Sequence, residues 1–203
     1  MPGDLEIATM PAGDEGAIIA RARAGDRDAV GDLFVLHSPS VRRLLRSVLG
    51  PGEDLDDLTQ EVFVRVHRSV ARYRGDSAFS TWLHRLTVNT ALSHLRTLGR
   101  RHLPTDPASI ALDMKDEAPD THDLAVGREM VRRLYAILDT ISPKRRAAFT
   151  LFEIEGRDLA QLAELMGISK AAAKSRVWFA RREVIKKAGN DPYLGTFLEE
   201  LER

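Results

Sequence analysis

The stretch that decides the fold is DLAQLAELMGISKAAAKSRVWFARREVIKK, residues 158–187. Asp158 and Gln161 have the spacing of a capping box, which opens a short helix. Gly167 permits a sharp turn, and Ser169 is a good N-cap for a second, longer helix. Together these signals predict a helix-turn-helix, the motif that places its second helix in the major groove of DNA. The alternative is an ordinary helical hairpin with a solvated basic face.

The second helix of this motif has two faces. Its apolar residues recur at helical spacing and predict a buried side. The other side is basic, and lysine, arginine and serine can contact base edges or phosphates, while an aromatic ring can contact a thymine methyl or a sugar. The residues that we expect on this DNA-contacting side are Lys170, Lys174, Ser175, Trp178, Arg181 and Arg182.

Outward from this motif, the rest of the chain also predicts helices, because no segment shows the sustained alternation of a strand. Turn signals separate expected helices at about residues 14–24, 26–49, 53–73, 78–98, 124–140, 143–154, 158–166 and 169–188. Pro39 predicts a kink or break in the second of them. The fold class is therefore all-α.

Composition divides the chain into two small domains. Residues 102–123 contain three Pro, five Asp and one Glu with little periodicity, which is typical of a flexible acidic linker. We therefore expect a flexible N-terminal tail at 1–13, a first domain at 14–101 and a second domain at 124–188, followed by a short tail at 189–203.

The distribution of charge predicts a nucleic-acid partner, although the 30 basic and 30 acidic residues cancel. Residues 65–101 hold eight Arg and one Asp, and residues 170–187 hold seven bases and one acid. One basic segment in each domain favours a protein that contacts nucleic acid at two points. Arginines that merely solvate helix surfaces are the alternative.

Several classes of function are excluded or disfavoured. The absence of cysteine excludes disulfides, thiol nucleophiles and Cys-ligated metal sites. The acidic N-terminus has no apolar signal region, and no run is long enough to span a membrane. We see no paired carboxylates, no nucleophile–base set and no phosphate loop, and His84, His94 and His102 lack metal-ligand spacing. We expect no enzyme activity, cofactor or metal ion, and a cytoplasmic location.

The third expected helix carries an acidic stripe opposite its apolar stripe. The stripe consists of Asp57, Gln60, Glu61 and Val64. Acids near a helix N-terminus are favoured by the helix dipole, but Glu61 lies two turns into the helix. A partly apolar acidic stripe therefore indicates docking on a basic protein partner.

The fourth expected helix and the loop before it combine polar and aromatic residues. Arg and Asn can read bases and hold phosphates, and the polar face of this helix carries Arg85, Asn89, Ser93, Arg96 and Arg100. The loop around Gly75, with Phe79 beside it, could form a pocket for a flipped or single-stranded base. Trp82 is expected in the hydrophobic core.

These motifs resemble a known family. DLTQEVF at 57–63, RGDSAFSTWL at 74–83 and VNT at 88–90 are similar to region 2 of bacterial sigma factors. SPKRRAAFTLFEIEGRDLAQLAELMGISKAAAKSR at 142–176 looks like region 4. Over about residues 15–188 the chain resembles the extracytoplasmic-function (ECF) group of the sigma-70 family.

The resemblance implies a promoter-specificity subunit of RNA polymerase. The acidic stripe would dock on the clamp helices of the largest core subunit, and the second domain on the flap. Arg176 joins the minus-35 residues of the second domain by this resemblance. The residues that would read and open the minus-10 element are Arg74, Gly75, Asp76, Ser77, Phe79, Arg85, Asn89, Ser93, Arg96 and Arg100. The linker would thread the polymerase channel, and an anti-sigma factor is an expected partner.

The sequence departs from the family pattern at Ser93, at Ala172-Ala173 and at Phe179. All three lie in or beside DNA-reading segments, so no promoter sequence can be carried over. Two other functions stay open: a stand-alone helix-turn-helix regulator, and a sigma-like adaptor that titrates an anti-sigma factor. Run-off transcription with core polymerase distinguishes them.

Overall fold

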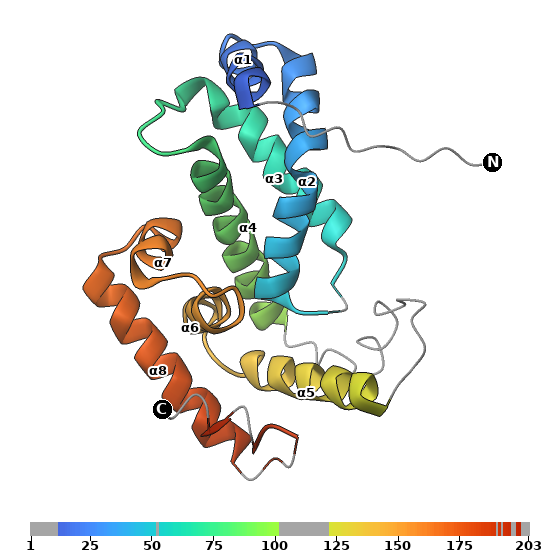
Figure 1. Ribbon diagram of the computed structural model, residues 1–203, viewed down its shortest axis with the longest axis vertical. Coiled ribbons are helices and arrows are strands. Elements are labelled where there is room, and N and C mark those ends of the chain that lie inside the picture. Colours follow the sequence, from blue (N-terminus) through green and yellow to red (C-terminus); the bar gives the residue numbers. More distant parts are fainter. Residues whose placement is uncertain are drawn as a thin grey trace, which may run out of the picture.

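The computed structural model describes residues 12–51, 53–101, 122–189, 191, 193–195 and 198–199. Within these residues every regular element is helical (Figure 1). The first domain consists of α1 (Ala12–Arg23), α2 (Arg27–Leu49), α3 (Leu55–Ser69), the short 3-10 helix η1 (Val70–Arg72) and α4 (Phe79–Arg101). The second consists of α5 (His122–Leu138), α6 (Pro143–Phe149), the π-helix η3 (Thr150–Ile154), α7 (Leu159–Met166) and α8 (Lys170–Ala188). The all-α prediction is confirmed.

Most helix boundaries lie within two or three residues of the predicted ones, and capping side chains set the N-termini of α2, α3, α7 and α8. The carboxylate of Asp26 accepts hydrogen bonds from the backbone N–H of Asp28, at 2.9 Å, and of Ala29. Of the kink or break predicted at Pro39, the break is wrong, because α2 continues through the proline to Leu49. Burial on both sides of the proline, with Leu33 and Val41 fully enclosed, stabilises the continuous helix despite the missing N–H donor.

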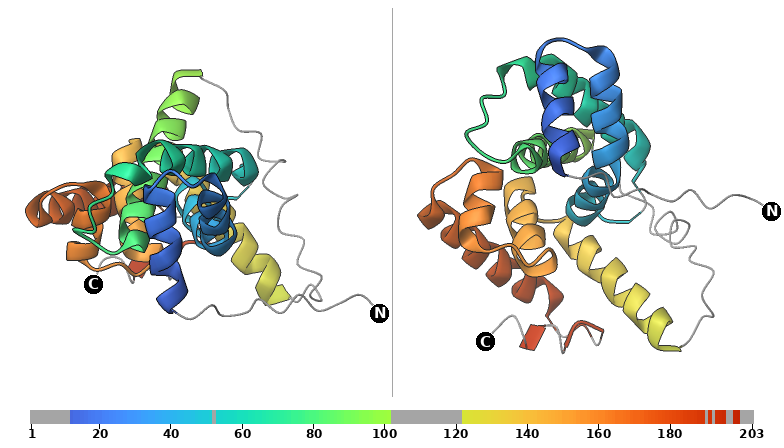
Figure 2. Two further views of the ribbon diagram at one scale, coloured as in Figure 1. Left: turned by 90° about the horizontal axis from the view of Figure 1, so that it is seen from above. Right: turned by 45° about the horizontal axis from the view of Figure 1, so that its top comes forward.

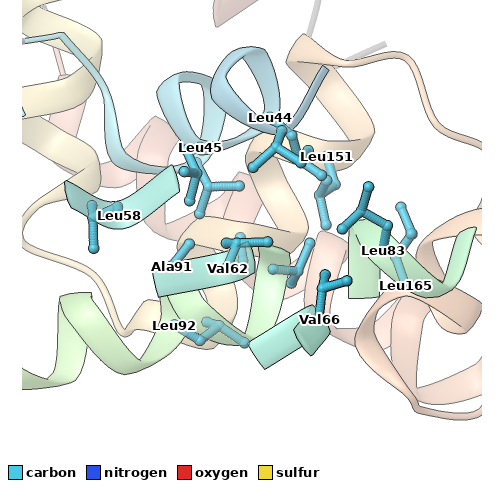
Figure 3. Packing of buried hydrophobic residues seen from close by; sticks show 14 of the residues in the cluster. Leu44, Leu45, Leu58, Val62, Val66, Leu83, Ala91, Leu92, Leu151 and Leu165 are labelled. Atoms are coloured by element: carbon cyan, nitrogen blue, oxygen red, sulfur yellow. The ribbon is translucent and has the colours of Figure 1, made fainter. Parts of the chain in front are cut away.

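The hydrophobic core of the first domain lies between α2, α3 and α4. Leu45, Val62 and Leu83 come from these three helices and are each fully buried. Figure 3 shows side chains of α2, α3 and α4 converging on one another, together with Leu151 of η3 and Leu165 of α7. This packing fixes which sides of α3 and α4 remain free for partners.

The hydrophobic core does not stop at the domain boundary. Ala147, Leu151, Leu162 and Ala163 of the second domain belong to the same buried cluster as the apolar residues of α2, α3 and α4. The views in Figures 1 and 2 agree that α6 and α7 lie beside α4. The two domains therefore pack against each other, an arrangement that the sequence did not predict.

The helix expected at 143–154 begins as α6 and widens into η3. A π-turn inserts an extra residue into the helix and redirects the side chains that follow. Here Thr150 and Leu151 are fully buried, while Glu153 points toward α8. The π-helix therefore contacts α2 on one side and α8 on the other.

The C-terminal segment packs against the second domain where it is described. Leu194 and Leu198 join a separate buried cluster with residues of α5 and α8. The guanidinium of Arg133 lies 4.4 Å from the ring centroid of Tyr193, and its Nη1 lies 2.9 Å from Asp191 Oδ2. These contacts fix the segment across α5. Of the predicted linker at 102–123, residues 102–121 lie outside the described residues, and the last two residues instead begin α5. Of the predicted N-terminal tail at 1–13, residues 1–11 lie outside the described residues, and the last two residues instead begin α1.

Candidate nucleic-acid and polymerase interfaces

The acidic stripe of α3 lies where the sequence placed it. Asp57, Gln60, Glu61 and Val64 are all exposed, on the side opposite the buried stripe of the helix. The carboxylate of Glu61 accepts a hydrogen bond from Arg65 Nη2 at 2.6 Å, one turn further on. An exposed pair of this kind contributes only a few tenths of a kcal/mol, so the stripe remains available to a partner.

Apolar side chains of α2 are also exposed, which was not predicted from the sequence. Val35 is 76% exposed, and Phe34 and Leu36 are about a third exposed. Phe34 contacts Phe63 of α3 edge to face, with ring centroids 4.8 Å apart. Residues 33–36 are four consecutive apolar residues, more than one face of a helix can bury. This run alone predicts that some of the four side chains are exposed. Together these side chains make α2 a candidate extension of the docking surface.

The loop before α4 is open at its tip. Arg74, Gly75 and Asp76 are exposed, and Gly75 has a positive φ of 83° that favours glycine. The base of the loop is held because the Tyr73 hydroxyl donates to the Ser77 carbonyl at 2.6 Å. The loop therefore presents backbone and polar groups from a fixed base.

The structure does not support the expectation that Phe79 contacts promoter DNA. Its ring is 4% exposed and packs against Tyr73, Trp82 and His37, with ring centroids 5.3 to 5.6 Å apart. A ring enclosed in this way cannot stack on a base in this conformation. Trp82 packs against the same hydrophobic core, as predicted.

The polar face of α4 is exposed beside this aromatic cluster. Arg85, Asn89 and Arg96 are exposed, and Ser93 is half-buried. Arg96 Nε donates to the Leu92 carbonyl one turn back at 3.0 Å, so part of this guanidinium is already engaged. The side chain of Arg100 lies outside the described residues. The face thus keeps three of its predicted polar groups accessible on one side of a rigid helix.

The helix-turn-helix forms as the sequence predicted. Asp158 accepts from the backbone N–H of Gln161 at 2.9 Å, and the Gln161 side chain accepts from the Asp158 N–H at 3.1 Å, which completes the capping box. Gly167 ends α7 with a left-handed conformation, φ 62° and ψ 44°. Ser169 then caps α8 by accepting from the Ala172 N–H at 3.2 Å. These local bonds fix the direction of α8.

The outward face of α8 carries most of the predicted DNA contacts. Trp178 is 49% exposed, and Lys170, Lys174, Ser175 and Arg182 are exposed with it. The guanidinium of Arg182 lies 4.9 Å from the Trp178 ring centroid, which orders both side chains before any ligand binds.

Two of the predicted α8 residues are less exposed than the others. Arg181 turns inward, where its Nε lies 2.5 Å and its Nη2 3.1 Å from the carboxylate of Glu153 on η3. This bidentate pair holds Arg181 against its own domain. Arg176 is also half-buried.

Stability should fall as the pH drops below about 6.5, because burial lowers the pKa of both His84 and His37. For His84 the nearby charge of Arg157 acts in the same direction. The unfolded chain takes up these protons first, so acidification through the ordinary histidine range stabilises the unfolded state. Urea unfolding at pH 7.5 and 5.5 measures the difference, and His84→Gln should reduce it. His67→Gln, at an exposed histidine of α3, is the control. An unchanged pH dependence of stability in His84→Gln would contradict the conclusion that buried His84 causes the loss of stability at low pH.

Neither a metal site nor a membrane span is found in the part of the chain that the structure describes. No group of three His, Asp or Glu side chains there could hold a metal ion. No described helix is both long and apolar enough to cross a bilayer.

Comparison with known proteins agrees with this architecture. Residues 33–101 match Sigma-70 region 2 and residues 131–184 match Sigma-70, region 4. The ECF RNA polymerase sigma-E factor of Haemophilus influenzae is 30% identical over 179 residues, covering 84% of this chain and 93% of that protein. The protein of the same description from Escherichia coli K12 is 29% identical over 176 residues, covering 84% and 92%.

Solved structures share the fold. A structure of CnrH in complex with the cytosolic domain of CnrY matches with a TM-score of 0.57 and 22% identity, covering 87% of this chain and 98% of that one. The sigma factor RpoE from Bartonella quintana, in complex with the anti-sigma factor NepR, matches with a TM-score of 0.51 and 21% identity, covering 77% and 94%.

Two helical domains with a helix-turn-helix in the second, matched in order to regions 2 and 4, define the class: a specificity subunit of RNA polymerase rather than an enzyme. The chain belongs to the sigma-70 family and, within it, to the ECF sigma factors.

Proposed function

We propose that the chain binds core RNA polymerase and directs it to promoters through four contacts. The acidic stripe of α3 contacts the clamp helices, and the second domain contacts the flap. The loop at 74–77 with the polar face of α4 reads and opens the minus-10 element. The outward face of α8 reads the minus-35 element as duplex DNA.

The observation that carries this proposal is the exposed basic and aromatic face of α8. Capping bonds at Asp158 and Ser169 fix the direction of α8, and the apolar side of the helix is buried. Lys174, Ser175 and Trp178 therefore project from a rigid helix, as direct readout in a major groove requires.

We also propose an anti-sigma factor as a regulatory partner and the cytoplasm as the site of action. Both structural relatives described above were solved with a bound protein, named as an anti-sigma factor for RpoE. The exposed apolar side chains of α2 and the acidic stripe of α3 offer such a protein the same surface that core polymerase would use. A partner on this surface would therefore compete with core polymerase.

Run-off transcription tests the function directly. Core polymerase with and without the chain is given a genomic fragment library that includes the DNA upstream of the chain's own gene, and transcript 5′ ends are mapped. We expect new start sites that depend on the chain and share two sequence elements. Binding to core polymerase without new starts would favour the adaptor function. Binding to DNA without binding to core polymerase would favour a stand-alone regulator.

A further inference from the structure

The C-terminal end of α2 is capped by side chains of the other domain. The last carbonyls of a helix have no partner within the helix and need one elsewhere. Arg146 of α6 donates from Nε to the Val48 carbonyl at 2.8 Å and from Nη2 to the Leu49 carbonyl. The Tyr135 hydroxyl of α5 donates to the Ser47 carbonyl at 2.6 Å. Three successive carbonyls of the first domain are thus satisfied by the second.

The charge and the shape of this contact are both specific. The guanidinium of Arg146, whose side chain is only 3% exposed, lies at the negative end of the α2 dipole. Its Nη1 also pairs with Asp139, which holds the group in place. On the α2 side, Gly50 has a φ of 90°, and a Cβ there would lie within 3.0 Å of three Tyr135 ring atoms. The Tyr135 ring therefore packs directly against Gly50, where any residue with a Cβ would collide with it.

The packed domains hold the two promoter-reading surfaces next to each other. Arg85 Nη2, on the α4 face, lies 3.7 Å from where a Cβ of Gly167 would be, in the turn before α8. Elements centred near minus 10 and minus 35 are about 25 base pairs apart, roughly 85 Å along B-DNA at about 3.4 Å per base pair. Surfaces this close cannot contact both elements at once. The domains must separate before the chain engages a promoter.

We infer that the contact of Arg146 and Tyr135 with the end of α2 is an autoinhibitory latch that holds the free chain closed. The inference rests on the proposed function of the two DNA-reading faces. Because the outward face of α8 is exposed in the closed form, an isolated minus-35 duplex can still bind. The latch acts on engagement of the whole promoter, which requires the open form.

A distance measurement tests the latch without reference to transcription. The chain has no cysteine, so Arg68→Cys on α3 and Glu164→Cys on α7 give two unique sites for spin labels on exposed positions of the two domains. We expect one narrow distance distribution in the free chain with the latch intact. Gly50→Ala should add a population at longer distances, because the new methyl group displaces the Tyr135 ring.

Gly25→Ala is the matched control for backbone strain. Gly25 has a similar φ of 95°, but a Cβ there meets nothing within 4 Å. Both substitutions force alanine into a backbone conformation with positive φ, which is unfavourable for it. Only Gly50→Ala also collides with the Tyr135 ring. Equal distance distributions in the two variants would reject the latch.

Tyr135→Phe removes one hydrogen bond and keeps the ring, so the fold is retained even if Gly50→Ala destabilises its domain. The ratio of open to closed chains should rise roughly two- to tenfold, the factor that one net hydrogen bond is worth. Tyr193→Phe, at an exposed tyrosine of the same domain, is the control and should change nothing. If the distribution of distances between the spin labels in Tyr135→Phe is as short and as narrow as in the wild type, the inference is contradicted.

Transcription separates failure of the latch from failure of the proposed function. In the Tyr135→Phe variant, the chain concentration for half-maximal promoter-dependent transcription should fall by the factor by which the open population rises. An opened chain with an unchanged concentration dependence would reject the autoinhibitory role. Absence of transcription from wild type and variants alike, with the distance change present, would reject the promoter function and leave the closure itself standing.

Discussion

Replacing Lys174 and Trp178 together by alanine should weaken binding to a minus-35 duplex by about 2–6 kcal/mol, since each contact to a base edge is worth about 1–3 kcal/mol. Both side chains are exposed on the outward face of α8 and contribute nothing to its buried side. The free energy of unfolding should therefore change little. Gel-shift or fluorescence-anisotropy titration at fixed salt measures the loss.

Lys187→Ala is the matched control for charge. Lys187 is exposed near the C-terminal end of the same helix, nine residues after Trp178, and it lines one hollow with Arg133 and Asp191 and another with Trp178 and Arg182. Its loss should weaken binding slightly and equally for all sequences, because it removes only long-range attraction to phosphate. The Lys174 and Trp178 variant should also lose its preference for minus-35 over scrambled DNA. Retained preference in that variant would show that another element reads the duplex.

The sequence predicted the helix-turn-helix because every signal for it is local. The capping box at Asp158, the turn at Gly167 and the cap at Ser169 act within four residues of themselves, so no distant contact is needed to recognise them. The exposed stripe of α3 was predictable for the same reason, from helical periodicity alone.

The sequence could not predict what depends on contacts between distant segments. Arg146 belongs to a basic run, yet it is almost fully buried against α2. Phe79 lies beside an exposed loop, yet its ring is enclosed by residues of three segments. Arg181 shared its predicted face with Lys174, yet its partner Glu153 lies 28 residues away. Pairing across such separations has no periodic signature, so charge and position on a helix were not enough to place these side chains.

Reversing the charge of Asp57 and Glu61 together, as Asp57→Lys and Glu61→Lys, should nearly abolish binding to core polymerase. If the partner surface is basic, each reversal replaces an attraction by a like-charge contact, and such contacts cost several kcal/mol at an interface. The fold should persist because both residues are exposed. Among the described residues, the ion pair lost is the i, i+4 pair of Glu61 with Arg65, worth a few tenths of a kcal/mol. Titration of labelled chain with core polymerase measures the effect.

The control for this variant is Glu164→Lys, an equal charge change at an exposed position on α7. It should leave affinity for core polymerase near the wild-type value. Binding of the doubly reversed variant to an isolated minus-35 duplex should be retained, because the face of α8 is untouched. The assignment of α3 as the docking surface therefore requires that this variant lose core binding and keep duplex binding.

Normal affinity for core polymerase in the reversed variant would move the docking surface from α3 to the exposed apolar residues of α2. Val35→Asp, at a side chain 76% exposed, would then be the decisive substitution.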